Sequence, residues 1–80
     1  MTPFDPTALL AMLRAFYPIV SVAALRQARL DRPDYFAGGE LFGTSGEKLR
    51  LPDGRAYDLI FDVGGPQARW QVIEVTGGGS

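Results

Sequence analysis

The chain has 80 residues, which is enough for one domain with one modest hydrophobic core. Hydrophobic residues make up 46% of it and its formal net charge is −1, so a disordered chain and a basic nucleic-acid binder are both disfavoured. Because Cys and His are absent, disulfides, thiol nucleophiles, Ser-His-Asp triads and ordinary zinc sites are excluded. Stability must therefore come from tight packing or from docking onto a partner.

Two helical segments are expected in the N-terminal half. Asp5 is a suitable N-cap and Pro6 a suitable first helical residue. The apolar residues that follow at helical spacing are Leu9, Met12, Leu13, Phe16 and Tyr17. Pro18 interrupts this pattern, and residues 22–30 again favour helix. The sequence leaves open whether Pro18 separates two helices or kinks one.

The clearest strand signal lies in the C-terminal half. Residues 48–51 alternate polar and apolar side chains, and so do residues 57–63. Pro52-Asp53-Gly54 between them has the residues of a tight turn. We expect a hairpin with a three-residue loop and a glycine bulge, because that register places Leu49 opposite Tyr57. The same register places Lys48 opposite Asp58, whereas a two-residue loop would place Leu49 opposite that aspartate.

A third strand is predicted over residues 69–75. Trp70 and Val72 alternate there with Ile73 and Val75, so either both faces are covered or a bulge shifts the parity near Ile73. Residues 40–42 could form a very short strand, which is not counted among the three. The sequence thus predicts one α+β domain over residues 1–76: an N-terminal helix or kinked helix pair packed on a three-stranded antiparallel β-meander. Residues 77–80 are expected to form a flexible glycine-rich tail.

Neither catalytic residues nor a cofactor site are indicated. Asp58 and Asp62 share a strand face in this reading, and Glu74 could approach one of them to form a weak divalent-ion site of an enzyme subunit. The favoured interpretation is a solvated face with charge pairing. Residues 43–48 superficially resemble a phosphate loop but lack its spacing, and a strand follows them, so a surface turn is favoured.

The candidate partner-binding residues fall into two groups. Arg26 and Arg29 belong to a short basic cluster with Arg32 and share one side of the second helical segment. They either complement the helix C-terminus or contact an acidic partner or a phosphate backbone. Four large apolar side chains flank the Gly38-Gly39 pair, where they either cap the core or anchor the chain on another subunit. These four side chains are Tyr35, Phe36, Leu41 and Phe42. Trp70 has the same two interpretations, with the core favoured.

The segment from Leu51 to Ile60, followed by Gly64-Gly65-Pro66 and by residues 69–72, resembles short open reading frames of tailed bacteriophages and related prophages. The resemblance covers roughly the C-terminal third and rests on turn and strand residues. It implies a small accessory protein of a virion, such as a capsid, neck or tail component. It carries over no catalytic or ligand residues.

These observations predict a non-catalytic structural or interaction protein that docks into a larger assembly, with a phage virion as one candidate. The alternative is a small inhibitor or regulator that binds one host protein. The final strand could also offer its edge to a neighbour. No apolar run reaches the roughly 20 residues that span a bilayer, and no positive residue precedes the first apolar run. We therefore expect a soluble protein, cytoplasmic when synthesised, whose partners are proteins rather than membranes, nucleic acids or small molecules.

Overall fold

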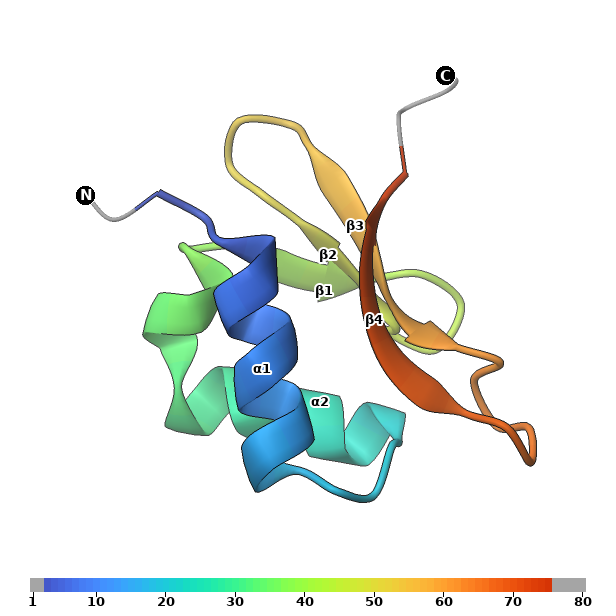
Figure 1. Ribbon diagram of the computed structural model, residues 1–80. Coiled ribbons are helices and arrows are strands. Elements are labelled where there is room, and N and C mark those ends of the chain that lie inside the picture. Colours follow the sequence, from blue (N-terminus) through green and yellow to red (C-terminus); the bar gives the residue numbers. More distant parts are fainter. Residues whose placement is uncertain (1–2, 76–80) are drawn as a thin grey trace.

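The computed structural model describes residues 3–75 and has an α+β fold with two helices and a four-stranded antiparallel sheet (Figure 1). The first part of the chain contains helix α1 (Pro6–Phe16), helix α2 (Val22–Asp31) and the 3-10 helix η1 (Pro33–Phe36). The sheet follows, with β1 (Glu40–Phe42), β2 (Lys48–Arg50), β3 (Ala56–Phe61) and β4 (Arg69–Glu74). The expected tail over residues 77–80 lies outside the described residues.

Both α-helices begin at side-chain caps. The Asp5 carboxylate accepts hydrogen bonds from the backbone N–H groups of Thr7 and Ala8, at 3.0 and 3.2 Å, which confirms the cap expected from the sequence. The Ser21 hydroxyl likewise accepts from the N–H of Ala24 at 3.0 Å. Pro18 lies between the two helices, in a connection that neither helix includes. It therefore separates two helices rather than kinking one.

The sheet has the strand order β1-β2-β3-β4, and each strand is antiparallel to its neighbours. The expectation of three strands was wrong by one, because residues 40–42 do form a strand. This strand is only three residues long and pairs with β2, with Leu41 opposite Leu49. In this sheet β1 and β4 are the two edge strands.

The hairpin between β2 and β3 has the register expected from its side chains. Lys48 lies opposite Asp58 and Leu49 opposite Tyr57. The N–H of Leu51 donates to the carbonyl of Arg55 at 2.8 Å, which closes a three-residue loop. Gly54, the last residue of this loop, has a φ of +99°, a region that L-residues with a Cβ rarely adopt.

Replacing Gly54 with valine should therefore destabilise the domain by about 1 to 3 kcal/mol, because a β-branched residue is strained at this φ. An ideal Cβ at Gly54 has no atom within 4 Å, so the loss would come from the backbone conformation alone. Thermal unfolding of Gly54→Val beside Gly54→Asn measures it, since asparagine tolerates positive φ better. Equal melting temperatures for Gly54→Val and the parent chain would contradict the prediction.

A bulge interrupts the pairing of β3 with β4. Asp58 lies opposite Ile73, and Ile60 lies opposite Trp70, so the segment of β4 between these pairs has one more residue than that of β3. The apolar residues of β4 do not alternate cleanly, and the sequence left either two covered faces or a bulge near Ile73 as the reason. The structure shows the bulge. Trp70 itself is 4% exposed, and its indole Nε1–H donates to the carbonyl of Tyr17 at 2.7 Å.

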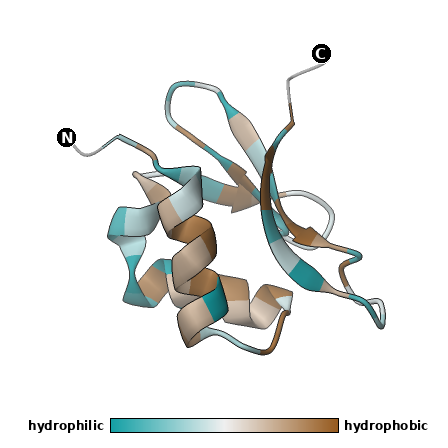
Figure 2. Ribbon diagram, in the orientation of Figure 1, coloured by the Kyte–Doolittle hydropathy of each residue, from teal (hydrophilic) through white to brown (hydrophobic). Residues whose placement is uncertain are grey.

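The hydrophobic core lies between the helices and the sheet. Figure 2 shows that the middle of α1 is mostly apolar, and α1 packs against β4. The fully buried large side chains come from both halves of the chain: Leu9, Leu13, Leu25, Phe36, Leu49 and Leu59. The apolar face expected for the first helix is confirmed at Leu9, Met12 and Leu13, whereas Phe16 is exposed.

Candidate protein-interaction surface

The outer edge of β1 carries backbone groups that do not pair within the sheet. The Leu51 N–H donates to the Arg55 carbonyl, and the Leu59 N–H donates to the Glu47 carbonyl at 3.1 Å. Glu47 and Leu51 therefore direct their backbone N–H and C=O groups toward β3. Because these groups alternate sides along a strand, those of Lys48 and Arg50 point toward β1. Lys48 lies opposite Phe42, and Arg50 lies opposite Glu40. It follows that the N–H and C=O of Leu41 point away from β2.

An arginine from α2 reaches the same edge. The Arg29 Nε–H donates to the carbonyl of Gly39 at 2.9 Å. This carbonyl lies two residues before Leu41 and therefore faces the same way. Arg29 thus ties α2 to the start of β1 and covers one edge acceptor, while its two terminal NH₂ groups still have donors to offer.

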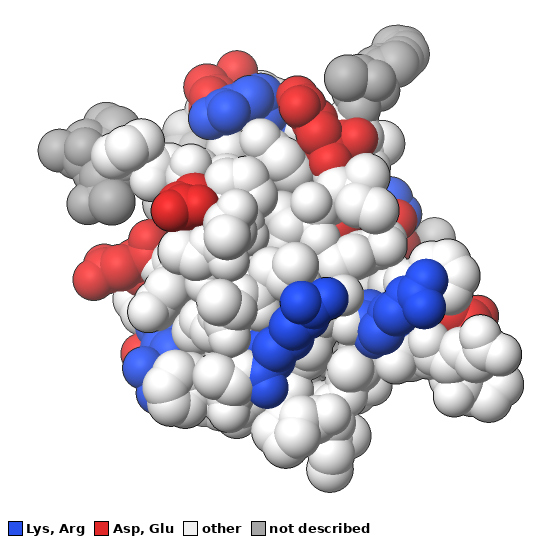
Figure 3. Space-filling model, viewed as in Figure 1, with Lys and Arg blue, Asp and Glu red and all other residues white. Residues whose placement is uncertain are grey.

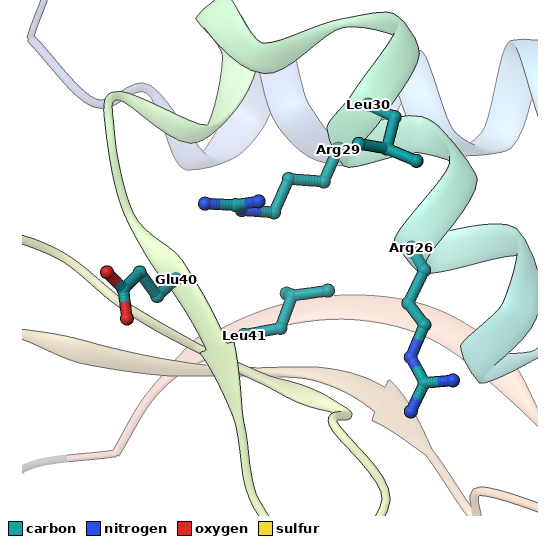
Figure 4. Close-up of a pocket in the computed structure, with 5 residues that line it drawn as sticks. All are labelled: Arg26, Arg29, Leu30, Glu40 and Leu41. Carbon is teal, nitrogen blue, oxygen red and sulfur yellow. The ribbon is translucent and has the colours of Figure 1, made fainter.

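A hollow of about 410 Å³ lies between α2 and this edge. We call it the edge groove, and it is lined by Arg26, Arg29, Leu30, Glu40 and Leu41. In Figure 4, Arg29 reaches from α2 toward β1, Leu41 projects between the two elements, and Arg26 and Glu40 lie at opposite ends. The side chain of Leu30 is 72% exposed, so the groove joins an apolar surface to two guanidinium groups.

The two arginines of the edge groove have no acidic partner among residues 3–75. The ion pairs found there join Lys48 to Glu47 and Arg55 to Asp53, and neither involves α2. Charges on the face seen in Figure 3 are dispersed rather than gathered into one patch of a single sign. The excess of positive charge in the edge groove is therefore a local feature.

A second hollow lies on the other side of β1. Its volume is about 420 Å³, and its lining includes Glu40, Phe42 and Arg50. The Arg50 guanidinium lies 4.4 Å from the centre of the Phe42 ring, a cation–π contact across the β1–β2 pair. The edge of β1 is thus flanked by a hollow on each face of the sheet.

The structure brings together only some of the residues predicted to bind a partner. Arg26, Arg29 and Leu41 line the edge groove, and Phe42 lies in the hollow on the opposite side of β1. Tyr35 is 37% exposed but lines a separate hollow beside the start of α1. Phe36 is 1% exposed and belongs to the core, which was one of its two interpretations.

Three residues of this surface were not singled out from the sequence: Leu30, Glu40 and Arg50. Leu30 has a signal that could have identified it, because it occupies the solvent side of a helix with weak amphipathic character. Glu40 and Arg50 become neighbours only through the pairing of β1 with β2, in which they lie opposite each other.

The loop between β1 and β2 is organised by a buried carboxylate. Glu47 is 7% exposed, and it accepts hydrogen bonds from the Lys48 ammonium and the Ser45 N–H, both at 2.9 Å. The bond from Lys48, followed by that from Ser45, lowers the pKa of Glu47 to about 2. Because Glu47 already uses the Ser45 N–H and the only lysine, these donors are not arranged around a phosphate. This agrees with the interpretation of residues 43–48 as a surface turn.

The low pKa of Glu47 predicts a loss of stability in acid. Its folded-state pKa lies below the ordinary value of 4.5, so the ionised form stabilises the fold. This contribution is complete above pH 5 and is lost as the pH falls toward 2. Glu47→Gln should cost about 1.5 to 3 kcal/mol at pH 7, because a charged acceptor is removed. Its unfolding free energy should then change less between pH 5 and pH 2 than that of the parent chain, as urea titrations would measure. Parallel pH dependences in the two proteins would contradict this role.

The three carboxylates considered for a metal ion do not form a site. Asp62 follows the end of β3 with a φ of +54°, so it does not share a strand face with Asp58. Glu74 lies opposite Tyr57, while Asp58 lies opposite Ile73, so Glu74 and Asp58 point to opposite faces of the sheet. Within residues 3–75, no group of three or more acidic side chains could hold a metal ion.

Comparison of the chain with protein-family models, with curated proteins and with solved structures finds no match. Across the described part of the chain, the helices are too short or too polar to cross a membrane.

Proposed function

We propose that this protein works by binding another protein and acts as a non-catalytic component that docks into a larger assembly. The observation that carries the proposal is the edge groove. Two guanidinium groups without an acidic partner within residues 3–75 lie there beside an exposed leucine and an edge strand. This combination of apolar, cationic and backbone groups suits recognition of a protein surface. A tailed-phage virion is one candidate assembly, on the basis of the resemblance in the C-terminal third.

Charge and size support the same proposal. The formal net charge of −1 gives no general attraction to polyanions, so the arginines of the groove act locally. An 80-residue domain without cross-links also gains stability when it binds a partner, because binding shifts the folding equilibrium.

Sedimentation of the tagged chain in lysate of the cell or virus that encodes it tests the proposal. Mass spectrometry would identify what co-sediments, and the Arg26→Glu variant provides a comparison. We expect stoichiometric recovery in a large particle, reduced by the charge reversal. Recovery as a small complex with one enzyme or regulator would instead favour the inhibitor. A monomeric profile under all conditions would contradict docking altogether.

A further inference from the structure

We propose that the edge groove binds an extended acidic segment of another protein chain, which adds as a strand beside β1 and whose acidic side chains contact Arg26 and Arg29. The inference rests on the proposed function and deepens it by naming the kind of segment that binds. It is drawn from three features of the groove: its backbone groups, its charge and the hollows on both sides of β1.

The backbone groups set the binding mode. The N–H and C=O of Leu41 face outward, as the hydrogen-bond pattern of the sheet requires. An added strand could pair with both groups while leaving the bond from Arg29 to the Gly39 carbonyl intact. Strand addition gives affinity through the main chain and needs no particular sequence for it.

The charge of the groove selects the side chains. Arg29 uses its Nε for Gly39, so its two terminal NH₂ groups can donate to a carboxylate. Arg26 is exposed and also lines the groove. Glu40 would repel a row of closely spaced phosphates, whereas a separate carboxylate can bind beside Arg26, at the end of the groove opposite Glu40. These features favour a protein segment over a nucleic acid.

The hollows on both sides of β1 match the alternation of a strand. Successive side chains of an added strand point to opposite faces of the sheet. One set would enter the edge groove beside Arg26, Arg29 and Leu41. The other set would lie in the second hollow beside Phe42 and Arg50. We therefore expect a segment with acidic residues at alternate positions, interspersed with apolar ones.

A random linear dodecapeptide display library, selected on the full chain, is the probe for this inference. Enriched peptides should carry aspartate or glutamate at alternate positions. The affinity of the most enriched peptide should fall about tenfold in Arg26→Glu, because a favourable charge contact becomes repulsive. Arg14→Glu is the matched control: it makes the same charge change at an exposed position of α1 that does not line the edge groove, and it should leave the affinity unchanged.

Hydrogen exchange by NMR separates strand addition from simple side-chain contact. Binding of the peptide should slow exchange of the Leu41 amide by about tenfold or more, because that amide gains a partner. The Phe42 amide faces β2 and should change little. Circular dichroism of Arg26→Glu would show that the variant is folded, since Arg26 has no side-chain hydrogen bond to another of residues 3–75.

Four results of the peptide experiments would overturn the inference. The first two are that no peptide is enriched, or that the enriched peptides show no preference for acidic residues. The other two are that Arg26→Glu binds the peptide as tightly as the parent chain, or that the exchange rate of the Leu41 amide does not change. Tighter binding of a single-stranded oligothymidine at the same arginines would also overturn it in favour of phosphate recognition. If sedimentation still recovers a particle while the peptide experiments fail, only the binding mode is wrong. If both fail, the proposed function fails as well.

Discussion

Trp70→Ala should destabilise the domain by about 3 to 5 kcal/mol, which is the cost of emptying a buried aromatic site. Trp70 is 4% exposed and lies on β4 opposite Ile60. Its indole donates to the carbonyl of Tyr17, so it joins the edge of the sheet to the connection between the helices. Removing it would leave a cavity and would take the indole donor away from that carbonyl.

The effect is large relative to the total stability of such a domain. At ordinary values per residue, a chain of this length is stable by about 4 to 12 kcal/mol. Trp70→Ala should therefore unfold at a much lower urea concentration, or fail to fold at 37 °C. Far-UV circular dichroism is the suitable probe, because the variant has no tryptophan fluorescence.

Trp70→Phe distinguishes the hydrogen bond from the packing. Phenylalanine keeps most of the ring volume but loses the N–H, so it should cost about 1 to 3 kcal/mol. If both variants lose the same stability, the hydrogen bond to Tyr17 dominates and the cavity argument is wrong. If neither loses stability, Trp70 does not join the two halves as described.

Gly39→Ala should cost about 3 kcal/mol, because a single added Cβ has no room. That atom would lie 2.8 Å from the Arg50 carbonyl oxygen and 2.8 Å from Leu49 Cδ1. The Phe36 carbonyl oxygen would be 3.1 Å away. Two of these three neighbours are backbone atoms of ordered elements, so β1 would have to move away from β2.

Gly54→Ala is the matched control, because the added Cβ would meet no atom within 4 Å and only the positive φ opposes it. Urea unfolding should show a clearly larger loss of unfolding free energy for Gly39→Ala than for Gly54→Ala. Equal stability losses at the two glycines would refute the steric argument.

Gly39→Ala should also weaken peptide binding. Displacement of β1 would deform the edge groove, so this variant should bind the acidic peptide with lower affinity than the parent chain.

Local signals in the sequence were sufficient to predict several elements. The cap at Asp5 depends on residues within one helical turn, and the structure has that cap. The register of the β2–β3 hairpin depends on the turn Pro52-Asp53-Gly54 and on the alternation beside it, and it is confirmed. In each case the decisive interactions join residues close in sequence, so composition and spacing contain the information.

The candidate site was harder to predict. Arg26, Arg29, Leu41 and Phe42 were identified as candidate contacts, but no sequence pattern indicated that α2 lies beside the edge of a sheet. Tyr35 and Phe36 looked equivalent to them in the sequence. The 3-10 helix turns Phe36 into the core and leaves Tyr35 beside the start of α1. That separation depends on packing between distant elements.

The sequence by itself determined the α+β class, the two helical segments, the hairpin and the absence of cysteine and histidine chemistry. Only the tertiary structure decided that residues 40–42 are a strand and that this strand is an edge. The physical reason is that a three-residue strand has too few residues for a periodic pattern, and its conformation is stabilised by pairing with β2. The edge groove exists because α2 lies beside that strand, tied to it by the hydrogen bond from Arg29 to Gly39.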